Sequence, residues 1–170
     1  MKKTLTALLL VVLPFLAVAQ SGPTDPAMQK ARAELEPVYA LSRLFGYLAT
    51  MEGQQPRLVL SRAQAAKIFD LMENIKAVRR FDAKTAVDML SEIEDRILTP
   101  QQLQFTDQLA LGASTTPGQN RPGNSSGTGS GPLASYVAGG PFNPMTEPNN
   151  KLGRDFASFS QLLSRKLGRQ

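Results

Sequence analysis

Apolar residues recur at helical spacing along residues 36–111 of the chain. Three segments carry apolar positions three or four residues apart, and a fourth, shorter segment carries three apolar residues, which predicts four helices joined by short connections. The apolar positions of the four segments are, in order, Val38, Leu41, Phe45 and Leu48; Ala65, Ile68, Met72 and Ile75; Ala86, Leu90, Ile93 and Ile97; and Leu103, Phe105 and Leu109. No segment alternates in the manner of a strand. We therefore predict an all-α fold, with a small antiparallel helical bundle or helical-hairpin domain over residues 27–111.

Two of the predicted helices begin with a capping box. In such a box a Ser or Thr hydroxyl accepts a hydrogen bond from the backbone N–H three residues later, and a Gln at that position reaches back to the cap. Each box follows a leucine, so the pattern Leu-[Ser/Thr]-x-x-Gln occurs twice, 38 residues apart. Its helix-capping residues are Leu60, Ser61 and Gln64, and Leu98, Thr99 and Gln102.

The composition changes beyond residue 111. Residues 112–150 are rich in Gly, Pro, Ser, Thr and Asn, and Arg121 and Glu147 are their only charged residues. A segment with so few apolar side chains buries too little surface to offset the entropy of ordering it. We predict a disordered linker over residues 112–150.

Residues 151–170 form a second amphipathic segment, predicted to be a basic helix. Its apolar residues lie three or four apart, and its basic residues lie on other faces. Such a helix packs back on its own domain, docks on a partner protein, or lies on an anionic membrane surface, and the pattern leaves all three open. The candidate partner- or membrane-binding residues are Leu152, Arg154, Phe156, Phe159, Leu163, Arg165, Lys166 and Leu167.

The first nineteen residues have the pattern of a signal peptide. Lys2 and Lys3 precede an apolar run, and Ala17-Val18-Ala19 supplies the small residues that signal peptidase accepts. The run is shorter than the ~20 residues of a membrane-spanning helix, which disfavours the alternative of a retained anchor. We predict cleavage after Ala19 and a location in the periplasm, the cell envelope or the extracellular space.

The composition argues against an enzyme. The chain lacks Cys and His, and with them the usual zinc ligands, thiolate nucleophiles and general bases. Asp88, Glu92 and Asp95 share a helix face that we expect to be solvated. We therefore predict no catalytic residues, no metal and no cofactor.

Residues 20–111 carry eleven basic and twelve acidic residues, whereas residues 112–170 carry six basic and two acidic residues, so positive charge is concentrated toward the C-terminus. Nothing in this balance indicates a nucleic-acid partner.

The paired motif over residues 58–111 resembles the periplasmic LTxxQ-motif proteins of the Spy/CpxP type. This resemblance implies a thin, cradle-shaped helical dimer that acts as an ATP-independent chaperone or a stress-signalling modulator. It also implies that the motif residues brace helix ends and perform no chemistry.

These observations predict an exported, non-enzymatic interaction module of the envelope that can form a homodimer. In the chaperone-like version, unfolded clients contact exposed parts of Phe45, Phe69, Met72 and Phe105, although the same residues also suit a core. In the alternative version the protein is a structural tether, with the bundle on one component and residues 151–170 on a membrane or a second protein.

Overall fold

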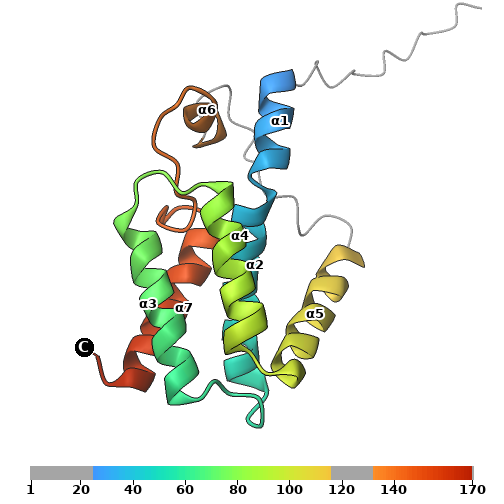
Figure 1. The fold of residues 1–170 in the computed structure, drawn as a ribbon, viewed down its shortest axis with the longest axis vertical. Coiled ribbons are helices and arrows are strands. Elements are labelled where there is room, and N and C mark those ends of the chain that lie inside the picture. The colour runs from blue at the N-terminus through green and yellow to red at the C-terminus, as the bar shows by residue number, and fades with distance from the viewer. Residues whose placement is uncertain (1–24, 116–131, 170) are drawn as a thin grey trace, which may run out of the picture.

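The computed structural model describes residues 25–115 and 132–169. These residues form seven α-helices and one short π-helix, with an isolated β-bridge and no strand, so the all-α prediction is confirmed. The elements are α1 (Pro26–Glu34), α2 (Glu36–Gln54), α3 (Arg62–Ala77), α4 (Ala83–Ser91), the π-helix η1 (Glu92–Ile97), α5 (Pro100–Thr115), α6 (Pro132–Val137) and α7 (Lys151–Leu167) (Figure 1).

Helix α2 is the centre of the bundle. It contacts α4, α5 and α7, while α3 packs against α7 and η1. Figure 1 shows α3 and α7 on one side of α2 and α5 on the other, with α1 continuing above the bundle, where it meets α6. Most of the apolar surface therefore lies between α2, α3, α4 and α7.

Local signals set the helix boundaries. The side chains of Asp25, Ser61, Asp82 and Asn150 each accept a hydrogen bond from a backbone N–H of the first turn that follows, as N-caps do. Pro37 lies in the first turn of α2, where its missing N–H costs nothing, and the chain breaks from α1 into α2 at Leu35.

One continuous core joins the early helices to α7. The ring of Phe45 on α2 meets Phe156 edge-on at 5.5 Å and lies 6.1 Å from Phe159. Both α7 phenylalanines are buried, and Leu163 and Leu167 extend the same stripe. Helix α7 is thus a core helix of the domain that the sequence assigned to residues 27–111 alone.

The predicted disordered linker over residues 112–150 is wrong for the described part of that range. Helix α5 continues through Thr115, and α6 and the following loop pack on the bundle with Tyr136, Phe142 and Met145 buried. The Phe142 N–H donates to the Arg79 carbonyl, and the Phe142 carbonyl accepts from the Phe81 N–H. Composition gave the wrong prediction because a few apolar residues are enough to order a segment when the rest of the bundle already offers a surface on which they can pack. Residues 116–131 lie outside the described residues.

The predicted signal peptide, residues 1–19, also lies outside the described residues. Within residues 25–115 and 132–169, no helix combines the length and the apolar character that crossing a bilayer requires.

Candidate functional site

The paired motifs meet at one end of the bundle. Ser61 accepts from the Gln64 N–H at 3.2 Å, and the Gln64 side chain accepts from the Ser61 N–H at 2.8 Å. Thr99 and Gln102 repeat the arrangement at 3.3 and 2.9 Å. Each capping box satisfies two backbone donors that the start of a helix would otherwise leave unpaired.

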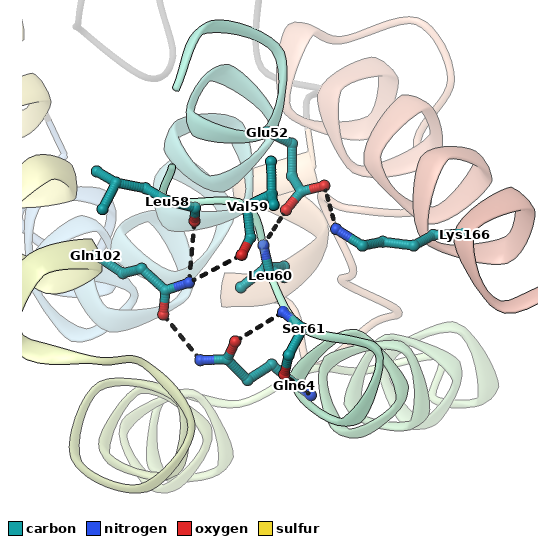
Figure 2. Close-up of polar contacts among 8 residues, drawn as sticks. All are labelled: Glu52, Leu58, Val59, Leu60, Ser61, Gln64, Gln102 and Lys166. Atoms are coloured by element: carbon teal, nitrogen blue, oxygen red, sulfur yellow. Dashed lines mark hydrogen bonds and ion pairs between the residues drawn. The ribbon is translucent and has the colours of Figure 1, made fainter. Parts of the chain in front are cut away.

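The two boxes are also tied to each other (Figure 2). The Gln64 amide nitrogen donates to the Gln102 side-chain oxygen at 2.8 Å and to the Ile97 carbonyl at 2.7 Å. The Gln102 amide nitrogen in turn donates to the carbonyls of Leu58, at 3.0 Å, and Val59, at 3.5 Å. Gln102 is only 3% exposed, and both polar ends of its side chain have partners. A buried amide satisfied in this way fixes the helix starts relative to each other.

This cross-tie has approximate two-fold symmetry. Val59 and Ile97 each lie two residues before a cap, and the carbonyl of each accepts from the glutamine of the opposite box. The preceding leucines, Leu60 and Leu98, are both buried in the core. The sequence correctly placed all six motif residues at helix starts, but it did not predict the hydrogen bonds between the two boxes. The only sign of those bonds in the sequence is that both boxes have the same internal spacing.

A partly buried ion pair extends this polar network to α7. The Glu52 carboxylate, on the last turn of α2, contacts the Lys166 amine at 2.7 Å and accepts from the Leu60 N–H (Figure 2). The Glu52 side chain is 6% exposed and the Lys166 side chain 25%. Three segments therefore meet at this carboxylate: the end of α2, the loop before α3 and the last turn of α7.

The apolar residues proposed for partner or membrane contact in α7 are not available on a free surface. Phe156, Phe159, Leu163 and Leu167 are buried, and Leu152 is half-buried. That part of the sequence prediction is wrong, because α2 and α3 offer α7 an apolar groove that no pattern within residues 151–170 reveals. Arg154 and Arg165 are exposed, whereas Lys166 is engaged by Glu52.

The four suggested client contacts separate into two groups. Phe45 and Met72 are fully buried core residues. Phe69 and Phe105 are half-buried at the edge of the core. The Phe69 ring lies under the cations of Lys76 and Arg169, at 5.8 and 5.2 Å from its centroid.

Two carboxylates of α4 and η1 pair with neighbouring cations. Asp88 pairs with Lys84 at 2.7 Å and Glu92 with Arg96 at 3.0 Å. Burial, followed by the charges of Asp107 and Asp95, raises the pKa of Glu94 above its ordinary value. Among the described residues, no three Asp or Glu side chains are grouped so as to hold a metal ion.

Helix α5 carries the most exposed large apolar side chain of the described residues. Its inward positions include the polar Gln102 and Thr106, both buried. Leu111 is 68% exposed, and Leu103 and Leu109 are half-buried and belong to no part of the core cluster of the described residues. The motif network is thus a structural brace with its polar groups paired, and the surface it positions is that of α5.

The chain was compared with models of known protein families, with curated proteins and with solved structures, and none of the three comparisons gave a match.

Proposed function

We propose that this protein is an exported, non-enzymatic interaction protein of the cell envelope that shields apolar segments of unfolded clients without nucleotide. The proposed client surface is the outer side of α5. The observation that carries the proposal is the exposure of Leu111, 68%, with the half-buried Leu103 two turns earlier on the same helix. Apolar side chains that a bundle leaves uncovered suit reversible contact with other apolar chains.

The anchoring of α5 supports a passive mechanism. Among the described helices, α2 is the one with which α5 makes an extensive contact. The Gln102 side chain ties the first turn of α5 to the loop before α3. A helix held at its start by a rigid polar brace can present the rest of its length to a partner without unfolding the core. Binding would then depend on the apolar area buried and need no chemical step.

The export part of the proposal is supported by the pattern of residues 1–19. The chaperone-like part is supported by the resemblance of the paired motif to LTxxQ-motif proteins. The non-enzymatic part is supported by the lack of Cys and His and by the pairing of Asp88 and Glu92 with neighbouring cations.

The test is an aggregation assay with heat-denatured citrate synthase as the client. Residues 20–170, which keep every described residue, should slow its light scattering at equimolar concentration. The double variant Leu103→Ser/Leu111→Ser should lose most of this protection, because it removes apolar surface from α5.

The matched control is Val87→Ser/Val137→Ser, which removes apolar side chains of 47% and 43% exposure from other helices. This control should protect as well as the unchanged protein. An unchanged protein with no effect on aggregation would contradict the client-binding proposal, and equal loss in both variants would contradict its assignment to α5.

A further inference from the structure

Basic side chains gather where the start of α3 meets the end of α7. The Arg62 guanidinium donates to the Leu167 carbonyl at 3.2 Å, which brings the first turn of α3 against the last turn of α7. Arg169 reaches back to Asp70 on α3 at 3.2 Å, and Lys166 reaches Glu52. Arg165 is exposed on the same turn of α7, and Arg57 is exposed in the loop before α3. We call Arg57, Arg62, Arg165, Lys166 and Arg169 the basic corner.

The basic corner keeps unneutralised positive charge. Its two carboxylates, Glu52 and Asp70, pair with Lys166 and Arg169. The ion pairs of the described residues leave Arg57, Arg62 and Arg165 without a carboxylate, since Arg62 contacts only a backbone carbonyl. These three cations add no ion pair to the fold, so their charge is free to act on an external anion.

The residues that follow α3 carry net negative charge. Residues 82–115, which form α4, η1 and α5, contain six carboxylates and two basic residues. Figure 1 shows α5 on the far side of α2 from α3 and α7. A negatively charged surface attracts the basic corner and repels residues 82–115. It therefore orients the protein with the basic corner toward that surface.

We propose that the basic corner docks on an anionic phospholipid membrane. Charge complementarity selects the anion, and the loop before α3 favours lipid over nucleic acid. In that loop Val59 is 42% exposed, two residues from Arg57. A small apolar tip beside arginines suits the headgroup region of a bilayer. Nucleic-acid binding instead needs aromatic rings open to stacking, and the nearby Phe69 is covered by Arg169 and Lys76.

This docking differs from the amphipathic-helix mode suggested by the sequence. The apolar stripe of α7 remains in the core, and only the polar outer side of its last turn faces the lipid. The bundle therefore binds the membrane without unfolding. The inference does not depend on client binding by α5, which uses another face of the molecule.

The experiment is sedimentation of residues 20–170 with vesicles of phosphatidylcholine, with and without about 30% phosphatidylglycerol. Binding should require the anionic lipid and should fall steeply when salt is raised to about 0.5 M. The variant Arg57→Gln/Arg165→Gln should weaken partitioning by roughly 25-fold, about fivefold for each arginine near the surface. Both side chains are exposed and neither contributes an ion pair, so the fold should be unchanged by circular dichroism.

The control Lys30→Gln/Lys84→Gln removes the same charge from α1 and α4, away from the basic corner, and should bind as the unchanged protein does. Binding that is absent on anionic vesicles, or equally weakened in both variants, would overturn the proposal. Binding to single-stranded DNA as tight as binding to the anionic vesicles would overturn the assignment to lipid.

Discussion

Helices α5 and α7 are nearly equal in length, with 16 and 17 residues, yet they join the bundle in different ways. Helix α7 buries Phe156, Phe159 and Leu163 against α2 and α3. Helix α5 rests on α2 and turns the polar Gln102 and Thr106 inward. Helix α7 is therefore held by apolar burial and α5 by a few directed hydrogen bonds, so the two helices should respond differently to the same kind of substitution.

The largest expected difference is between two phenylalanines. Phe159→Ala should lower the free energy of unfolding by about 4 kcal/mol, because it opens a cavity in the fully buried cluster with Phe45. Phe105→Ala, at a half-buried position on α5, should cost about 1–2 kcal/mol. Urea unfolding followed by circular dichroism measures both. Equal losses would contradict the view that α7 belongs to the core and α5 to its edge.

The brace at the start of α5 should show the next largest effect. Gln102→Ala removes the partner of the Thr99 N–H and of the Gln64 amide, and should cost about 2–3 kcal/mol. Gln108→Ala, exposed on the same helix, should change stability by less than about 0.5 kcal/mol. The readout is the urea midpoint of each variant against the unchanged protein. A Gln102 variant as stable as the Gln108 variant would show that the cross-tie adds no stability.

Alanine at two glycine positions, one in α7 and one in α5, should change the stability of the fold in opposite directions. A Cβ at Gly153, in the first turn of α7, would collide with the backbone oxygen of Glu147, so Gly153→Ala should destabilise the fold by about 2 kcal/mol or more. A Cβ at Gly112, near the end of α5, meets nothing within 4 Å. Gly112→Ala should therefore stabilise α5, by about 0.5–1 kcal/mol through helix propensity. Thermal melting of both variants tests the signs, and a Gly153 variant as stable as the unchanged protein would count against the close docking of α7.

The smallest expected effect is electrostatic and depends on pH. Burial first, and then Asp107 and Asp95, raise the pKa of Glu94 in the folded protein above 4.5, so folding favours its protonated form. The stability that protonation contributes is fully present below the unfolded-state pKa and is lost as the pH rises through the folded-state pKa. Glu94→Gln should therefore stabilise the protein at pH 7 by a few tenths of a kcal/mol at most, because solvent screens this half-exposed group. Urea midpoints at pH 7 and well below pH 4.5 should show the gain only at the higher pH.

Features that depend on neighbouring residues could be predicted from the sequence. The caps at Ser61 and Asp82 and the break before Pro37 are decided within four residues, and the structure has them at those positions. The π-helical turn of η1 was not predicted. It precedes Leu98 and delivers the Ile97 carbonyl to Gln64, a contact set by the opposite capping box and not by η1 itself.

Features that depend on distant surfaces could not be predicted. The pattern of α7 is compatible with a core, a partner or a membrane, and only the groove of α2 and α3 decides among them. The segment around Phe142 and Asn143 was misjudged for the same reason. The Asn143 amide donates to the carbonyls of Ile75 and Val78 at the end of α3, a partner 65 to 68 residues earlier in the chain.

The position of α7 in the core has a consequence for how the chain folds. Glu52 and Lys166 are separated by 114 residues, and the groove between α2 and α3 stays empty until synthesis has passed Leu167. Contacts that span so much of a chain form slowly, because a long loop must close before they contribute any stability. The nascent polypeptide therefore lacks the apolar contacts of α7 until its last helix has been made.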